Sequence, residues 1–423
     1  MSSSRQDKEE YRLETLANGQ QLVSERLDHV RSVCLGFWIP AGSRNEGDHN
    51  AGVTHFIEHL LFKGSQRYTA EEIAQAFDAI GGELNAATTK EYVVVHARCL
   101  DEHLPTAMDV LSDMLLTPTF TDLDKEREVV LEEIAMYEDA PQELVHDVFA
   151  HSVFGDHALG QPVLGSIDTI SALPEADIRD YHRRHFACGD MVVAAAGDVD
   201  HDRLRELLQT HMPVTDSQGA LRDRQDPAWS PRQVFLAKET EQVHVCVGGR
   251  GIARGDERRF ALSVLDGLFG GSLSSRLFQE VREKRGLVYS IFSFASMYRE
   301  TGLSGIYFGC RPDRLAQVME TVYREIGRLR SEPVGQEELV RAREHLKGRV
   351  ILGLESTSSR MTRLGKGIVT ETEIVSLDET AARIDAVTAD QIGELACELF
   401  QPDLLCVAGI GSDESVFRAA LPS

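Results

Sequence analysis

Two histidines and a glutamate fall within one five-residue segment, His55-Phe56-Ile57-Glu58-His59. On an α-helix, residues three and four apart share a face, so His55, Glu58 and His59 would point the same way. Two imidazoles one turn apart can both bind a tetrahedral zinc ion, and a neighbouring glutamate can accept a proton from a water that the metal acidifies. The spacing H-x-x-E-H is the signature of the inverted zincins. It predicts one zinc ion per chain and a peptidase activity with Glu58 as the catalytic base.

A catalytic zinc ion usually takes three protein ligands, so a third donor is expected elsewhere in the chain. The segment KEREVVLEEIAMYED has strong helix formers throughout and offers four candidates, Glu126, Glu128, Glu132 and Glu133. Glu126 and Glu133 are seven apart and lie two turns apart on one helical face, so one could bind zinc while the other orients a histidine. An acidic helix is also typical of a solvated surface, and periodicity alone leaves the choice open.

The segments around these residues are similar to one family of peptidases. GVTHFIEHLLFKGSQRYT resembles the zinc helix of the pitrilysin family (peptidase family M16), and EREVVLEEIAMYEDAPQE resembles the helix of its third ligand. Further stretches, GGELNAATTKEY, SSRLFQEVREKRGLVYS and LESTSSRMTRLG, extend the resemblance over nearly the whole chain. The chain looks most like the short two-domain bacterial members, which resemble the β subunit of the mitochondrial processing peptidase. The resemblance implies a zinc metalloendopeptidase that hydrolyses peptides or unfolded polypeptide segments.

The resemblance also implies roles for the acidic residues. By position, Glu133 would be the third zinc ligand and Glu126 the neighbouring carboxylate that supports a ligand. The stretch from His59 to Glu133 is slightly shorter than in the best-known members, so Glu132 stays an alternative. The partner seven residues before Glu133 favours Glu133.

Two further sets of residues gain a role only through the resemblance. Arg282 and Tyr289 are seven apart in VREKRGLVY and correspond to a family pair that reaches the active site, where the arginine holds a substrate carbonyl and the tyrosine stabilises the oxyanion. The segment 84–89 corresponds to an edge strand that pairs with an extended peptide. Asn85 and Ala86 are therefore expected to contact the substrate. Without the family, the first set is an ordinary arginine and tyrosine and the second a turn entering a strand.

The chain also carries an internal repeat. VHARCLDEHLPTAMDVL in the first half matches IYFGCRPDRLAQVMETV in the second, and MVVAAAGDV near the end of the first half matches DLLCVAGIG near the end of the chain. The pairs Cys99/Cys310, Leu104/Leu315 and Met108/Met319 share an offset of 211, and Gly197/Gly409 are offset by 212. Several matches at nearly one offset indicate duplication of a whole domain.

The repeat and the secondary-structure periods predict the architecture. We expect an N-terminal zinc-binding catalytic domain over 1–212, a proline-containing polar linker over 213–231, and a C-terminal domain over 232–423 that carries the Arg/Tyr pair. Helical and strand periods alternate within each half. The predicted fold class is α+β, with two homologous domains, each a mixed β-sheet with helices packed on one face.

The composition of the chain excludes some classes of binding partner. The formal net charge of −24 argues against nucleic acid as a partner, because such binding depends on neutralising phosphates. No apolar run reaches the length of a membrane helix, and the first residues lack the pattern of a targeting peptide. The seven cysteines are scattered and include no CxxC pair. These observations predict no nucleic-acid partner, no membrane partner and a cytoplasmic location, whereas peptide substrates are implied by the resemblance to the pitrilysin family.

The resemblance also implies a homodimer, and the sequence leaves two alternatives to a self-sufficient peptidase. Family members of this length pair two chains, so a homodimer is expected by resemblance. One alternative is a non-catalytic scaffold of the same fold, although such relatives have damaged zinc motifs whereas this chain keeps His55, Glu58 and His59. The other is a presequence-type processing peptidase that needs a partner subunit. The presence of Arg282 and Tyr289 in the same chain favours a self-sufficient enzyme.

Overall fold

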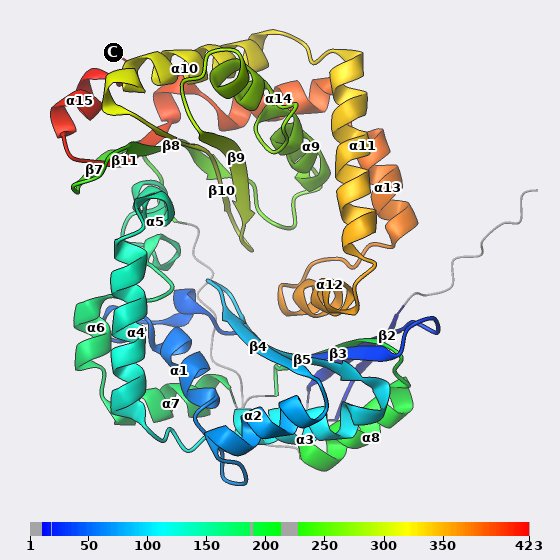
Figure 1. The fold of residues 1–423 in the computed structure, drawn as a ribbon. Helices are drawn as coiled ribbons and strands as arrows, with labels where there is room; N and C mark the ends of the chain where they lie inside the picture. The colour runs from blue at the N-terminus through cyan, green and yellow to red at the C-terminus, as the bar shows by residue number, and fades with distance from the viewer. Residues whose placement is uncertain (1–10, 18, 187–188, 213–226, 423) are drawn as a thin grey trace, which may run out of the picture. The chain divides into compact units, whose positions relative to one another are not determined.

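The computed structural model describes residues 11–17, 19–186, 189–212 and 227–422. These residues form two compact units, each built around one sheet (Figure 1). The first unit takes the described residues of Met1–Ile134, Pro162–Asp223 and Gly353–Ser376. The second takes those of Ala135–Gln161, Arg224–Leu352 and Leu377–Ser423. Each unit therefore includes a segment from the opposite half of the sequence.

The first unit contains a six-stranded mixed sheet. In spatial order its strands are β1 (Arg12–Thr15), β2 (Gln21–Arg26), β6 (Val192–Gly197), β3 (Ser32–Ile39), β5 (Val93–Leu100) and β4 (Glu83–Thr88). Strands β2 and β6 run parallel, and all other neighbours are antiparallel. Strand β4 therefore forms one edge of the sheet.

The main core of the first unit lies on one face of this sheet. The helices of the unit are α1 (Val53–Leu61), α2 (Ala70–Ala79), α3 (Leu104–Leu116), α4 (Leu123–Glu138, which ends in the second unit), α6 (Ile167–Ala172), α7 (Glu175–His185), α8 (His201–His211) and α12 (Thr357–Val369). Val93 and Val95 of β5 pack in one core with Phe56 of α1 and Leu111 of α3, all fully buried. Val94 belongs to a different cluster, because successive strand residues face opposite sides of a sheet.

Helix α12 covers the other face of the same sheet, although it comes from the second half of the sequence (Figure 1). The indole Nε1 of Trp38 donates to Met361 Sδ at 3.4 Å. A Cβ at Gly365 would overlap that indole, so glycine permits the close approach of helix and sheet. Arg360 of α12 also donates to the buried carboxylate of Glu25 on β2. Apolar packing and a buried ion pair thus hold α12 on this sheet.

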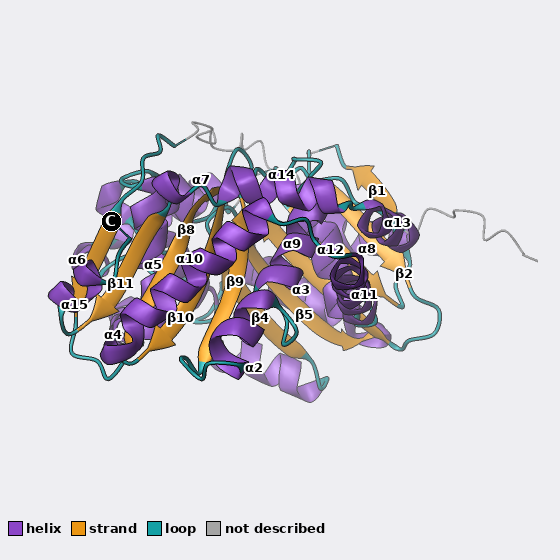
Figure 2. Ribbon diagram, turned by 90° about the horizontal axis from the view of Figure 1, so that it is seen from above, coloured by secondary structure: helices purple, strands orange, loops and turns teal. Residues whose placement is uncertain are grey.

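The second unit repeats the arrangement with five strands. In spatial order these are β7 (Gln233–Ala237), β11 (Cys406–Gly411), β8 (Val243–Gly251), β10 (Gly302–Cys310) and β9 (Ser290–Met297), with β7 and β11 parallel. Its helices are α5 (Pro141–Phe154), α9 (Arg259–Phe269), α10 (Leu315–Ser331), α11 (Gln336–Gly353), α13 (Leu377–Ala386), α14 (Ala389–Leu399) and α15 (Glu414–Ala419). Helix α5 buries Val145 and Phe149 against Cys246 and Tyr307, on the face opposite the main core. Figure 2 shows both mixed sheets among their helices.

The two sheets share one topology, since the order β2-β6-β3-β5-β4 corresponds to β7-β11-β8-β10-β9. The predicted α+β class with two homologous mixed-sheet domains is confirmed, and the structure adds one helix to the second face of each sheet. The predicted boundaries at 212 and 232 divide the sequence into two halves, but the two compact units do not follow that division. The segment that contains α5 comes from the first half and packs in the second unit, whereas the segment that contains α12 comes from the second half and packs in the first unit. Most of the predicted linker, residues 213–226, lies outside the described residues.

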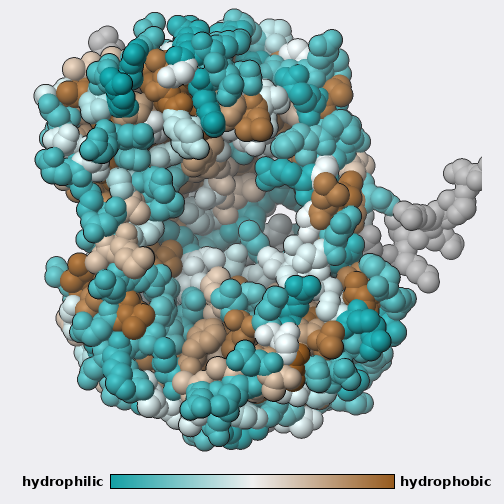
Figure 3. Space-filling view, viewed as in Figure 1, coloured by the Kyte–Doolittle hydropathy of each residue, from teal (hydrophilic) through white to brown (hydrophobic). Residues whose placement is uncertain are grey.

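The surface in view is mostly polar in both units, with apolar side chains scattered among the hydrophilic ones (Figure 3). This distribution agrees with the formal net charge of −24. Within the part of the chain that the structure describes, no helix combines the length and apolar character needed to cross a bilayer.

Candidate metal centre

Helix α1 presents the H-x-x-E-H residues because its apolar residues fix its orientation. Phe56, Ile57 and Leu60 are fully buried in the core of the first unit. The remaining side of the helix then carries His55, which is buried, and Glu58 and His59, which are half-buried. The 3.6-residue period therefore groups these three polar side chains, as the sequence predicts.

Glu133 of α4 joins the two histidines. Its Oε2 lies 3.2 Å from His59 Nε2 and 3.7 Å from His55 Nε2. One donor atom from each of the three residues lies within 4.8 Å of the other two. Ligand atoms of a tetrahedral zinc ion with bonds of about 2.05 Å are about 3.3 Å apart, so the two distances from Glu133 suit a zinc ion held by three protein donors. Glu132, the alternative third ligand, is exposed and not part of the cluster.

The environment of His55 suits a neutral ligand. Burial, and then the neighbouring His59, lower the pKa of His55 to about 3. The ring is therefore neutral at pH 7, and a neutral imidazole is the form that binds a metal ion. Its Nδ1 is buried without a hydrogen-bond partner in the described part of the chain.

Glu126 orients the second histidine. This buried carboxylate lies 2.9 Å from His59 Nδ1 and also accepts from the Lys63 ammonium at 2.7 Å. A hydrogen on Nδ1 leaves Nε2 of His59 with a free lone pair toward Glu133, which is the tautomer needed for metal binding. The sequence predicts Glu126 but misses Lys63. Lys63 lies in the turn just after the end of α1, and its spacing of four residues from His59 is the signal that could have found it.

Glu58 lies beside the edge strand of the sheet. Its carboxylate accepts a hydrogen bond from the hydroxyl of Thr88, the last residue of β4. Burial raises the pKa of Glu58, although the bond from Thr88 opposes this effect. A pKa raised toward neutrality improves a carboxylate as a proton acceptor at physiological pH. No sequence signal identifies Thr88 as the partner, because the two residues belong to different elements.

The predicted substrate contacts lie on β4, one strand position apart. Ala86 packs against the main core, on the same side of the sheet as α1. Asn85 points to the other face and its Oδ1 accepts from the Ala86 N–H at 2.8 Å. The side chain of Asn85 is therefore directed away from the metal cluster.

Arg282 and Tyr289 lie together in the second unit. Arg282 belongs to a π-helical turn over Phe278–Glu283, and Tyr289 immediately precedes β9. The guanidinium of Arg282 lies over the Tyr289 ring, 5.1 Å from its centroid, and over the Phe278 ring at 4.6 Å. Tyr289 is 79% exposed. The structure thus pairs the two predicted residues and leaves the tyrosine hydroxyl available to a ligand.

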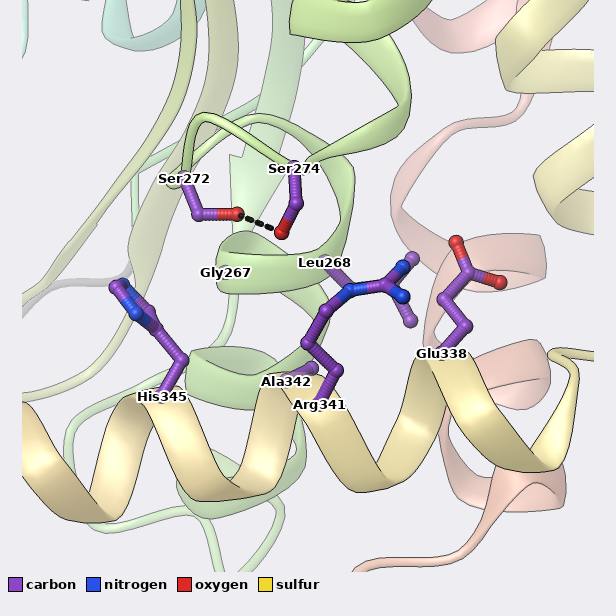
Figure 4. Close-up of a pocket in the computed structure, with 8 residues that line it drawn as sticks. All are labelled: Gly267, Leu268, Ser272, Ser274, Glu338, Arg341, Ala342 and His345. Atoms are coloured by element: carbon purple, nitrogen blue, oxygen red, sulfur yellow. Dashed lines mark hydrogen bonds between the residues drawn. The ribbon is translucent and has the colours of Figure 1, made fainter.

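The second unit has a small pocket between α9 and α11 (Figure 4). Its lining residues are Gly267, Leu268, Ser272, Ser274, Glu338, Arg341, Ala342 and His345. Glu338 is held by two hydrogen bonds of 2.8 Å from Arg276. Across the described ranges, His55, His59 and Glu133 form the one group of three metal-binding side chains, so this pocket has no equivalent cluster.

Comparison with known proteins agrees with these features. Residues 21–167 match the family described as insulinase (peptidase family M16), and residues 172–346 match the domain described as peptidase M16 inactive domain. An uncharacterized zinc protease of Streptomyces coelicolor is 44% identical over 395 residues, covering 90% of this chain and 85% of the relative. An uncharacterized zinc protease of Bacillus subtilis is 39% identical over 391 residues, covering 92% and 95%.

The fold is also shared with solved structures. A crystal structure described as a peptidase M16 inactive domain from Pseudomonas fluorescens matches with a TM-score of 0.89 and 20% identity, covering 95% of this chain and 98% of that one. Two family matches that together span most of the chain, and relatives of such identity and coverage, show the family. The chain therefore belongs to peptidase family M16.

Proposed function

We propose that this protein is a zinc-dependent endopeptidase in which His55, His59 and Glu133 hold one zinc ion and Glu58 is the general base. The observation that carries the proposal is the approach of two imidazole nitrogens and one carboxylate oxygen to within 4.8 Å of each other. The names of the relatives support zinc as the metal. Bound at these donors, zinc would act as a Lewis acid that makes a water molecule more acidic.

Residues of the chain would carry out the proton transfers and hold the ligands in place. Glu58 would take a proton from the attacking water onto its carboxylate and pass it to the leaving amine. The hydroxyl of Thr88 would hold that carboxylate in place. Glu126 would keep His59 in the tautomer whose Nε2 is free, and Lys63 would balance the charge of Glu126.

Peptide binding would use the edge of the first sheet. Strand β4 lies at that edge, and Thr88 at its end contacts Glu58. An extended peptide could pair with the backbone of β4 near Asn85 and Ala86, which would allow many side chains in the substrate. Arg282 would bind a substrate carbonyl, and Tyr289 would donate to the oxyanion of the tetrahedral intermediate.

The experiment compares wild type with Glu58→Gln, Glu133→Gln and the matched control Glu132→Gln, measuring zinc content and digestion of a mixed peptide library. We expect Glu58→Gln to keep its zinc and to lose about a hundredfold or more in rate, as for removal of a general base. Glu133→Gln should lose metal, whereas Glu132→Gln should behave as wild type. Equal cleavage by wild type and Glu58→Gln would refute the mechanism. A wild type that binds zinc but cleaves nothing would favour the scaffold alternative.

The homodimer and the cytoplasmic location remain predictions. Gel filtration of the purified chain tests the first, and an elution volume of one chain would contradict it. A presequence-type peptidase would instead need a second, different subunit for cleavage, so activity of the purified chain alone argues against that alternative.

A further inference from the structure

The zinc helix has no local cap at its N-terminus. Helix α1 begins after Gly52, whose φ of +90° lies in the left-handed region and whose lack of a side chain provides no hydrogen-bond acceptor. The first N–H groups of any α-helix have no partner within the helix, so they need acceptors from elsewhere. His55 lies within this first turn. The position of His55 therefore depends on what fixes the turn.

Glu46 supplies the missing acceptors from outside the helix. One oxygen of its carboxylate accepts from the Gly52 N–H at 2.7 Å, and the other accepts from the Thr54 N–H at 2.8 Å. Thr54, which is fully buried, also donates its hydroxyl to the Tyr181 phenol at 3.0 Å. A negative charge at a helix N-terminus is favourable as well, because it complements the helix dipole. Both carboxylate oxygens thus hold the turn that carries His55.

The loop that carries Glu46 is also tied to the segment after β4. The Ser43 and Arg44 N–H groups donate to the backbone oxygens of Thr89 and Lys90 at 3.1 and 3.0 Å. The buried side chain of Arg44 donates to Glu91 at 2.7 Å. Thr88, directly before this segment, is the residue that holds Glu58. The loop therefore connects the support of His55 with the support of Glu58.

We propose that Glu46 is a positioning residue of the metal centre, which fixes the first turn of α1 relative to the end of β4 and so sets where His55 lies. The inference rests on the proposed zinc site but goes beyond it, because the hydrogen bonds described for Glu46 join it to Gly52 and Thr54 and not to the proposed ligands or Glu58. Burial raises the pKa of Glu46 to about 7, against the effect of its hydrogen bonds from Gly52 and Thr54.

The test measures the zinc dissociation constant by competition with a chelator, together with the thermal midpoint of the metal-free protein. Glu46→Gln keeps the size of the side chain but offers one acceptor oxygen in place of two, and its amide group would face an N–H donor. We expect zinc binding to weaken by about tenfold, the lower end of the effect of removing a support of a ligand, with little change in the midpoint. Asp48→Asn, an equal charge change at an exposed position of the same loop, should match wild type.

The possible outcomes separate this inference from the proposed function. An unchanged dissociation constant in Glu46→Gln, or a weakening that only follows a loss of folded protein, would overturn it. If Glu46→Gln does not fold, Glu46→Asp decides instead, because its shorter side chain keeps the charge but cannot reach both N–H groups. Wild-type affinity in that variant would also overturn the inference. Failure of wild type to bind zinc at all would remove the proposed function first, and the inference with it.

Discussion

The metal cluster of the first unit and the pocket of the second occupy corresponding places in the repeat. With the offsets of 211 and 212 seen in the repeat, His55 corresponds to Asp266 or Gly267, and Glu133 corresponds to Glu344 or His345. The elements correspond as well. Helix α1 follows β3 and α9 follows β8, and α4 and α11 are each the second α-helix after the hairpins β4-β5 and β9-β10. Both units have the scaffold, but within the described residues three metal-binding side chains come together only in the first unit. Fold and chemistry are therefore separable in this chain.

The two sites differ in the partners of one carboxylate, which is Glu126 in the first unit and Glu338 in the second. In the first unit, Glu126 shares its two oxygens between His59 and Lys63. In the second unit, Glu338 of α11, at an offset of 212 from Glu126, accepts hydrogen bonds on both oxygens from the guanidinium of Arg276. A bidentate arginine leaves this carboxylate no oxygen directed at a ligand. In the second unit this carboxylate is thus part of an ion pair, and the region matches the domain described as peptidase M16 inactive domain.

The largest expected effect is that of His55→Ala. Removing one of the two imidazoles leaves too few donors for tight binding, so we expect loss of the metal and of about a thousandfold or more in activity. Zinc content after dialysis and the rate of peptide cleavage check the prediction. Circular dichroism should stay that of a folded protein. Full zinc occupancy in this variant would contradict the ligand assignment.

A smaller loss of activity is expected for Tyr289→Phe. This variant tests whether the second unit, which has no metal cluster among its described residues, contributes a side chain to catalysis. Removing one donor to a developing oxyanion costs about a hundredfold in kcat. Zinc content and KM should change little, because the hydroxyl contacts neither the metal nor the substrate ground state in the proposed role. Steady-state kinetics on one fluorogenic peptide measures both parameters. A wild-type kcat would show that the exposed tyrosine is not part of the mechanism.

Removing the cation should have different effects on the ion pair Lys63–Glu126 of the first unit and the ion pair Arg276–Glu338 of the second. Lys63→Ala leaves Glu126 without its cation, and we expect zinc binding to weaken by about tenfold. Arg276→Ala breaks a mostly buried bidentate pair, and we expect it to cost about 1–3 kcal/mol in the free energy of unfolding. Zinc affinity and urea denaturation, measured on both variants, give the comparison. Weaker zinc binding in Arg276→Ala would mean that the second site still influences the first.

The sequence predicts those features of the site that depend on local periodicity. Placing His55, Glu58 and His59 on one face requires only the helical period, and pairing Glu126 with Glu133 requires only their spacing of seven. The repeat likewise predicts two sheets of one topology. Supports such as Glu46 and Thr88 are not predictable in this way, because their partners lie on other elements. The exchange of α5 and α12 is also missed, since packing on a sheet of the opposite half leaves no mark in the spacing of residues.

The smallest effect is expected in the second pocket. His345→Ala should leave zinc content at one ion per chain and cleavage at the wild-type rate, because His345 belongs to no group of three metal-binding side chains among the described residues. Gly267→His is the stricter variant. A Cβ at Gly267 meets no atom within 4 Å, so the helix can accept the new imidazole. Zinc titration should still give one ion at micromolar concentrations, since Glu338 stays bound to Arg276 and two imidazoles alone do not complete a zinc site. A second tightly bound ion would mean that the second unit lacks a metal site because it lacks histidines, and not because Arg276 occupies Glu338.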